Sequence, residues 1–381
     1  MMMRIAIDVH MVGERETGNE TYTLNLVRHL LKLDTANRYG LITPHPERLR
    51  EKLALPPHAE ILQVWPAQPF LRVPLAMPLL VRRWQADLLH VNYVAPPLSP
   101  CPVVVTVHDI SYEFFPHFFS PRDRRMLATM VPFSARGAAQ VIAVSERTRQ
   151  DLMDVYGIPW DRITVTYEAA APHFAPVADK AAQDAVCTRY GLRRPYVLAL
   201  GNLQPRKNVA RLVEAFGLAR REAGLPHQLV VAGKAQWRES EVFAAVYRLG
   251  LEDAVVFPGY VADEDLPALY SAADCFAYPS LYEGFGLPPL EAMACGAPVL
   301  CSRAGALGEV VGDAAWVVDP TDVGDIARGL VALLTDPNVA QEYRRRGRER
   351  ASAFSWRRLA EQTLAVYRDV VQETRRKHGS G

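Results

Sequence analysis

The feature that most constrains the fold of this chain is an alternation of short apolar runs with amphipathic helical stretches, which occurs in two series. The first series begins at Arg4–Val9 and the second at Tyr196–Leu200. Short strands separated by helices indicate a parallel sheet with helices on both faces. Residues 172–184 lie between the series, are rich in Pro, Ala and Asp, and predict a linker. The chain is therefore expected to form two doubly wound α/β domains in tandem.

Each series contains further elements whose limits the sequence predicts. A helix is expected over about residues 20–33, and Ser145 is expected to cap a later one. The further strands expected in the first series are Leu88–Asn92, Val103–Val107 and Gln140–Val144. Those expected in the second are Gln228–Ala232, Ala254–Phe257, Cys275–Tyr278 and Pro298–Cys301, followed by a last helix at Trp356–Thr374. Such sheets bind ligands beyond the carboxyl ends of their strands, so the loops there are the places to look for chemistry.

The overall composition excludes several classes of protein. A net charge of +1 leaves no basic surplus, so no nucleic-acid partner is expected. The five cysteines form no CxxC pair, which argues against a disulfide framework or a structural zinc site and favours a reducing compartment. The N-terminus lacks the apolar segment of a signal peptide, and no apolar run has the roughly 18 residues that a spanning helix needs. A cytoplasmic protein is therefore expected.

The most informative segment is Tyr282–Met293, which reads YEGFGLPPLEAM. Its glycines permit close backbone approach and its prolines suit the first turn of a helix, so the N–H groups of Phe285–Leu287 are expected to point at a phosphate. Two carboxylates flank this site, Glu283 in the loop and Glu291 about one turn into the helix. Both suit the hydroxyl pairs of a sugar or a ribose. The alternative is that Glu291 complements the helix dipole and Glu283 is solvated.

Two other loops carry charged or titratable side chains. Arg206 and Lys207 stand after a predicted strand in the sequence LGNLQPRKN and could neutralise a diphosphate, or form an ordinary solvated basic pair. His108 falls just past the strand Val103–Val107, where it could bond a sugar hydroxyl or act as an acid or base. Its alternative is a structural histidine bonded to Asp109 or to the backbone.

Two weaker patterns concern phosphate and metal binding. Gly18 could allow close backbone approach near a helix start, although Asn19 or Thr21 could equally be plain N-caps. No GxGxxG sequence follows the first strand, which disfavours a dinucleotide oxidoreductase. Asp263–Asp265 resembles a DxD metal motif, but it precedes an apparent helix, and helix capping explains it more simply. No metal site is therefore expected.

Together these segments resemble glycosyltransferase family 4, the retaining enzymes of the GT-B fold. The resemblance covers nearly the whole chain and is densest from LGNLQPRKN through FPGYVADEDLPALY to PSLYEGFGLPPLEAMACGAPVL, where Glu283 and Glu291 fit the family's E-x7-E motif. It implies two Rossmann-like domains facing a central cleft. An acceptor-binding domain is expected over residues 1–175, a nucleotide-sugar-binding domain over residues 185–355, and a helix crossing back to the first domain over residues 356–374.

The resemblance also implies a role for each candidate residue. The expected catalytic set is His108, which contacts the donor sugar, Arg206 and Lys207, which stabilise the leaving diphosphate in place of a metal, and Glu283, which holds sugar hydroxyls. The other expected contacts are Gly18 with the phosphates or the acceptor, Phe285, Gly286 and Leu287 with sugar and phosphate, Glu291 with the ribose, Gly259, Tyr260 and Val261 with the base, and Gly233 and Lys234 close to it.

The sequence departs from the family in one loop. Residues 18–22 read GNETY where many relatives carry a GxGRY-like sequence, so only Gly18 carries over. Retention by double displacement would need a carboxylate nucleophile at the anomeric carbon, and glutamates that hold diols are not placed for that. A front-side displacement is expected instead, in which the leaving phosphate accepts the proton of the attacking hydroxyl.

The stretches VHDISYEFFP and TYEAA are similar to bacterial mannosyltransferases of surface-polysaccharide assembly. This similarity favours GDP-mannose as the donor, with a UDP-hexose second, no further cofactor, and a saccharide or lipid-linked saccharide acceptor. The expected place is the cytoplasm, at the inner face of the membrane. Tyr112–Phe119 with Arg122, Arg124 and Arg125 is expected to grip an acceptor, to touch the membrane or to pack against the first domain. The alternatives to sugar transfer are a nucleotide-sugar epimerase and a sugar phosphorylase on the same fold.

Overall fold

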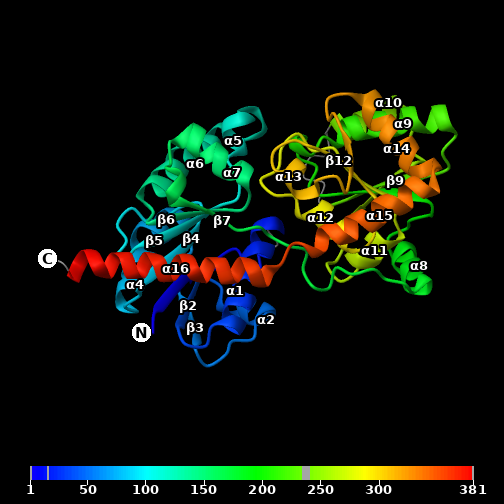
Figure 1. The fold of residues 1–381 in the computed structure, drawn as a ribbon. Helices are drawn as coiled ribbons and strands as arrows, with labels where there is room; N and C mark the ends of the chain where they lie inside the picture. The colour runs from blue at the N-terminus through cyan, green and yellow to red at the C-terminus, as the bar shows by residue number, and fades with distance from the viewer. Residues whose placement is uncertain (1, 15–16, 234–240, 380–381) are drawn as a thin grey trace. The chain divides into compact units, whose positions relative to one another are not determined.

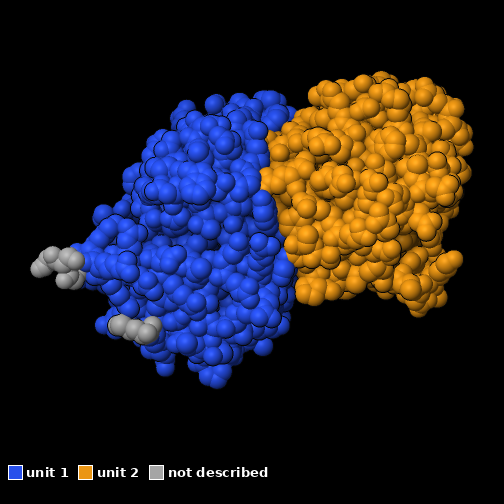
Figure 2. All heavy atoms as spheres, in the orientation of Figure 1, with its two compact units in different colours: residues 1–168, 355–381 blue, residues 169–354 orange. Residues whose placement is uncertain are grey.

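The structure is a computed structural model that describes residues 2–14, 17–233 and 241–379. The chain divides into two compact units, which Figure 2 shows in different colours. Unit 1 comprises residues 1–168 and 355–381, and unit 2 comprises residues 169–354. Each unit is built on its own parallel sheet (Figure 1). The C-terminal helix belongs to unit 1, although the whole of unit 2 precedes it in the sequence.

Unit 1 contains a seven-stranded sheet with the order β3-β2-β1-β4-β5-β6-β7. Its strands are β1 (Arg4–Asp8), β2 (Arg38–Thr43), β3 (Ala59–Gln63), β4 (Leu88–Asn92), β5 (Val103–Val107), β6 (Gln140–Ala143) and β7 (Ile163–Val165). Its helices are α1 (Thr17–Leu33), α2 (Pro46–Lys52), α3 (Pro69–Leu71), the π-helix η1 (Arg72–Ala76), α4 (Met77–Arg83), α5 (Ser111–Phe114), η2 (Pro116–Phe118), α6 (Pro121–Gly137), α7 (Glu146–Tyr156), η3 (Trp160–Arg162) and α16 (Trp356–Gly379). The direction of winding reverses between β1 and β4, which is where sheets of this type place their ligand sites.

Different helices pack against the two faces of this sheet, because side chains alternate along each strand. Val105 and Val107 point into a core that α4, α6 and α7 complete. Thr106 points the other way and contacts Tyr22 of α1. The neighbouring His90 contacts Tyr367 of α16, and α1 and α16 lie side by side (Figure 1).

Unit 2 contains a six-stranded sheet with the order β10-β9-β8-β11-β12-β13. Its strands are β8 (Tyr196–Leu200), β9 (Gln228–Ala232), β10 (Val255–Gly259), β11 (Cys275–Tyr278), β12 (Val299–Ser302) and β13 (Trp316–Val318). Its helices are α8 (Lys180–Arg189), η4 (Pro205–Lys207), α9 (Val209–Ala223), α10 (Glu241–Arg248), α11 (Leu266–Ala272), α12 (Leu287–Ala294), α13 (Leu307–Val311), α14 (Val323–Thr335) and α15 (Pro337–Ser352). Leu212 and Phe216 of α9 pack with Ile326 and Leu330 of α14 in its core. The winding reverses here between β8 and β11.

The structure corrects the expected elements in two respects. Strands β2, β3, β7 and β13 were not predicted from the sequence. Helix α8 occupies part of the segment expected to be a linker, because it buries only Gln183, Val186 and Cys187 and so has little apolar periodicity to reveal it. Ser145 caps α7 as expected, and its hydroxyl accepts from Thr148 N at 3.0 Å.

Candidate active site

The charged residues of unit 2 converge at the point where its strand order reverses. Arg206 and Lys207 lie in η4, just after β8, and Glu283 lies in the loop between β11 and α12. The carboxyl ends of β8 and β11 share one edge, so these loops meet. Leu281 N donates to Arg206 O at 2.8 Å and fastens one loop to the other.

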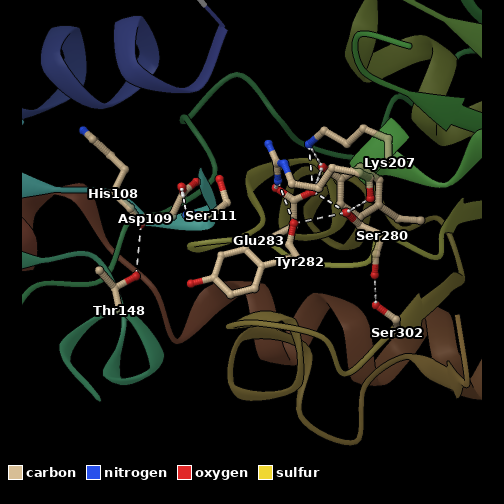
Figure 3. A network of polar contacts seen from close by, with 11 residues as sticks. His108, Asp109, Ser111, Thr148, Lys207, Ser280, Tyr282, Glu283 and Ser302 are labelled. Carbon is tan, nitrogen blue, oxygen red and sulfur yellow. Dashed lines mark hydrogen bonds and ion pairs between the residues drawn. The ribbon is translucent and has the colours of Figure 1, made fainter. Parts of the chain in front are cut away.

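The Glu283 carboxylate is the centre of this cluster. Arg206 Nη1 donates to Oε2 at 2.6 Å, and Lys207 Nζ donates to Oε1 at 2.8 Å. The hydroxyls of Ser280 and Tyr278 also donate to Oε1, at 2.6 and 3.0 Å, and Figure 3 shows Lys207, Ser280 and Glu283 pointing toward one another. Burial alone would raise the pKa of Glu283, but the charges of Arg206 and Lys207 lower it to about 2. Glu283 is therefore an anion at neutral pH, and not the solvated loop residue of the alternative interpretation.

Contacts to backbone atoms also hold the loops around Glu283 in place. Asn208, whose φ is 60°, donates through Nδ2 to Pro279 O at 3.0 Å and to Pro320 O at 2.6 Å. Gly305 packs against the Glu283 peptide so closely that an added Cβ would lie 2.3 Å from Glu283 O. Ala306 N donates to the same carbonyl at 2.8 Å. The position of Glu283 is thus fixed from two other loops.

The segment after Glu283 forms the loop and helix that the sequence predicts. Gly286 has a φ of +112°, a value that favours glycine, and α12 begins at Leu287. Glu291 lies about one turn into α12, is buried, and accepts from Tyr270 OH at 3.1 Å. That Glu283 and Glu291 hold one ligand remains a prediction.

Three glycines bring neighbouring strand ends of unit 2 into close contact. Gly201 N donates to Ala232 O at 2.9 Å, and Gly233 N donates to Gly259 O at 2.8 Å. A Cβ on Gly233 would lie 2.1 Å from Gly201 O, so only glycine fits there. Beyond Gly259 the side chain of Tyr260 is exposed and that of Val261 is buried. That the backbone of residues 259–261 contacts the base remains a prediction. The predicted Lys234 lies outside the described residues.

In unit 1, His108 follows β5 and is buried. Its Nε2 lies 3.0 Å from Asn92 Oδ1 and its Nδ1 lies 3.3 Å from Glu168 Oε1. The ring therefore does not bond Asp109 or the backbone, as the alternative interpretation had it. Asp109 instead accepts from Ser111 N at 2.9 Å, and Thr148 Oγ1 donates to the His108 carbonyl at 3.0 Å (Figure 3). Neither residue was predicted as a partner of His108: Asn92 ends an ordinary predicted strand, and Glu168 lies in the TYEAA stretch, where no local pattern shows that its carboxylate reaches His108.

The start of the helix near Gly18 in unit 1 differs from what the sequence predicts. Helix α1 begins at Thr17, so Gly18 lies inside its first turn, and neither Asn19 nor Thr21 is its N-cap. A Cβ on Gly18 would meet nothing within 4 Å, so no close approach within the protein requires glycine there. Glu20 has a role that the sequence did not reveal, since its Oε1 accepts from Gly13 N at 2.8 Å.

A second polar cluster at the carboxyl end of β1 was also missed. His10 Nδ1 lies 2.9 Å from Asp8 Oδ2, and both residues sit beside the reversal point of the unit 1 sheet. Burial opposes ionisation of Asp8, but His10 and Arg72 lower its pKa. The position of the pair directly after the first strand is the signal that could have found it.

Contacts decide two further expectations, the capping role of Asp265 and the packing of the aromatic segment. Asp265 does not cap α11 through its side chain; it accepts instead from Arg189 Nη1 and from Tyr190 OH, at 2.7 and 2.8 Å. In the described ranges no group of acidic, histidine and cysteine side chains is arranged to hold a metal ion. Tyr112 is buried and bonds Tyr156 OH at 2.8 Å, so part of the aromatic segment packs within unit 1.

Comparisons with known proteins agree with this architecture. Residues 17–170 match the family described as Glycosyltransferase Family 4, and residues 189–350 match the family described as Glycosyl transferases group 1. The chain is 38% identical over 267 residues to O-antigen chain mannosyltransferase B of Escherichia coli, covering 70% of each protein.

Two solved structures show the same fold at low identity. Sucrose-phosphate synthase from Thermosynechococcus elongatus aligns with a TM-score of 0.77 and 23% identity, over 97% of this chain and all of that one. HepE of Anabaena in complex with UDP-glucose aligns with a TM-score of 0.73 and 22% identity, over 96% of this chain and all of that one. The predicted family and the predicted pair of Rossmann-like domains of the GT-B class are thus confirmed. Over the described residues, no helix combines the length and apolarity needed to cross a bilayer.

Proposed function

Because this chain belongs to glycosyltransferase family 4, and is therefore a retaining glycosyltransferase, we propose that it transfers mannose from GDP-mannose to a hydroxyl of a lipid-linked saccharide in surface-polysaccharide assembly. The observation that carries the proposal is the buried cluster of Glu283, Arg206 and Lys207 at the carboxyl edge of the unit 2 sheet. Mannose is favoured by the named activity of the E. coli relative. A UDP-hexose is the second candidate donor, supported by the UDP-glucose in the HepE structure.

The two cations would bind the donor diphosphate without a metal ion. One carboxylate between two cations leaves a net charge of about +1, which suits a leaving diphosphate. Arg206 has five N–H donors and Lys207 has three, so each can hold a phosphate oxygen while it remains bonded to Glu283. Their low exposure places this charge in a low dielectric, where it acts more strongly than in water.

The other residues of unit 2 would hold the rest of the donor. Glu283 would accept hydroxyls of the sugar, and Glu291 would accept those of the ribose. The backbone at Phe285, Gly286 and Leu287 would face sugar and phosphate in front of α12. The glycine-lined strand ends at Gly233 and Gly259 would let the base approach the backbone.

Sugar transfer would follow a front-side displacement. The acceptor oxygen forms a bond to the anomeric carbon on the side from which the diphosphate leaves, so the configuration is retained. The bond from that carbon to the phosphate oxygen breaks, and the leaving phosphate takes the proton of the acceptor hydroxyl. Arg206 and Lys207 balance the charge that develops on the diphosphate. His108 would contact the donor sugar, and unit 1 would bind the acceptor, in the cytoplasm at the inner face of the membrane.

The proposal is tested by ligand-induced stabilisation and by product analysis. GDP-mannose or GDP should raise the melting temperature with and without EDTA, and UDP and ADP compounds should not, because a ligand that binds only the folded state stabilises it. A mannosylated acceptor with retained anomeric configuration is the expected product. Stabilisation that disappears with EDTA would contradict the metal-free site. Conversion of the nucleotide sugar without an acceptor, or a requirement for inorganic phosphate, would instead indicate an epimerase or a phosphorylase.

A further inference from the structure

One helical segment of unit 1 is apolar on two opposite sides. The segment consists of α3, η1 and α4, which follow one another without a break from Pro69 to Arg83. Its buried side chains include Val73, Met77 and Val81, and its exposed ones include Leu71, Leu75 and Leu79. A helix that is apolar all round normally lies inside a protein core or in a membrane. The core of unit 1 accounts for only one of the two sides.

The exposed apolar surface continues into the loop before this segment. Trp65 is 84% exposed, Phe70 is 72% exposed and Leu79 is 69% exposed. Soluble proteins seldom expose several large apolar side chains along one stretch unless the surface binds something. Tryptophan in particular is enriched at the boundary between lipid and water, where its ring is half in each phase.

The charges of the same stretch are all positive. No acidic residue occurs between Glu60 and Asp87 in the sequence. Arg82 and Arg83 are exposed at the end of α4, and neither forms an ion pair with a carboxylate of the described chain. The apolar surface is therefore bordered by two uncompensated positive charges.

A second helix repeats this combination on the same side of the sheet. Helices α4 and α6 both pack on the sheet face that Val105 and Val107 line. On α6, Met126, Met130 and Phe133 are exposed at helical spacing, and Arg122 and Arg125 are exposed in its first turns. Acyl chains would accept the apolar side chains, and lipid phosphates would accept the arginines.

We propose that unit 1 binds the surface of an anionic lipid bilayer through a docking surface formed by Trp65, Phe70, Leu75, Leu79, Arg82 and Arg83, with the exposed side of α6, which packs on the same core, as a second contact. The apolar side chains enter the boundary between headgroups and acyl chains, and the arginines attract anionic lipids. This inference rests on the proposed function in one respect: the docking surface is where the protein would meet a lipid-linked acceptor.

Vesicle binding tests the docking surface without donor or acceptor, so its failure is distinguishable from failure of sugar transfer. The whole protein should co-sediment with vesicles in which phosphatidylglycerol replaces about a third of the phosphatidylcholine, and far less with pure phosphatidylcholine. Leu75→Ser with Leu79→Ser should weaken binding more than about tenfold, because two apolar side chains no longer enter the bilayer. Arg82→Glu with Arg83→Glu should remove the preference for anionic vesicles, at about fivefold or more for each charge.

Matched variants elsewhere act as controls. Tyr247→Ser removes an exposed apolar side chain of unit 2, and Arg357→Glu with Arg358→Glu reverses an exposed pair on α16; both should bind as the parent protein does. Unchanged melting temperatures would show that the docking variants fold. The proposal is overturned if the parent protein ignores the vesicles, if the controls lose binding equally, or if sedimentation shows a dimer that Leu75→Ser with Leu79→Ser dissociates.

Discussion

The two units share one architecture but use their apolar and charged residues differently. In the described residues, thirteen of the fifteen exposed large apolar side chains belong to unit 1, and only Tyr247 and Tyr260 belong to unit 2. Unit 2 instead buries an ionic cluster around Glu283, whereas His90 of unit 1 is buried between the neutral groups Thr106 and Tyr367. The same doubly wound sheet thus carries a buried ionic cluster around Glu283 in one unit and most of the exposed large apolar side chains in the other.

The largest expected effect comes from removing the cations of unit 2. Arg206→Ala or Lys207→Ala should lower kcat by about 10²–10³-fold, because each would remove a charge that we propose stabilises the leaving diphosphate and would leave Glu283 partly uncompensated. Steady-state kinetics with GDP-mannose measure this effect. Arg248→Ala, which removes an exposed arginine paired with Glu214, is the control and should keep full activity. Full activity in both cluster variants would show that the ionic cluster is structural only.

The backbone around the cluster gives the next effect. Gly305→Ala should lower kcat by on the order of 10²-fold, because the new Cβ would lie 2.3 Å from Glu283 O and must displace that residue. Gly224→Ala is the control, since Gly224 has a φ of 61° against 62° for Gly305 and its Cβ would meet nothing within 4 Å. Equal losses in the two variants would mean that backbone strain, and not the position of Glu283, controls turnover.

The sequence predicted the elements whose apolar residues are concentrated. Strands β4, β5, β8, β9 and β11 begin and end where expected, because each is a nearly continuous apolar run that both sheet faces bury. Edge strands such as β3 and β13 are only partly buried, and their mixed composition resembles that of a loop. The alternation of strands and helices, repeated in two series along the chain, was sufficient to predict the fold class.

The site was predicted only where a motif marks it. The loop with Glu283, and Arg206 with Lys207, were found as separate segments, but local sequence does not reveal that they form ion pairs 76 and 77 positions apart. Tyr278 and Ser280, which complete the shell of Glu283, are ordinary residues at the end of a strand. Such partners are fixed by the meeting of two loops in three dimensions, which no local pattern encodes.

The third effect concerns the buried hydrogen-bond network of His90, Thr106 and Tyr367 in unit 1. Burial, together with the nearby charge of His108, lowers the pKa of His90 to about 3, below its ordinary value of 6.5. Below pH 6.5 the unfolded chain binds a proton at His90 and the folded chain does not, so the free energy of unfolding decreases as the pH falls. Between pH 7 and 5 the loss should be about 2 kcal/mol. Hydrogen exchange of β4 and β5 measures it, and His90→Asn should abolish this pH dependence; an unchanged dependence would show that other groups cause it.

The smallest effect is the pH dependence of stability that Glu283 gives unit 2, and it falls in a different pH window. The pKa of Glu283 is lowered from 4.5 to about 2, so its contribution to stability is complete above pH 4.5 and is lost as the pH falls toward 2. Between pH 5.5 and 3.5 the loss should be about 1 kcal/mol, and between pH 7 and 5 it should be negligible. Hydrogen exchange of β8 and β11 in the parent protein and in Glu283→Gln measures the difference. If β8 and β11 instead lose protection together with β4 and β5 between pH 7 and 5, the two units unfold as one, and the contrast between their buried networks does not extend to their stability.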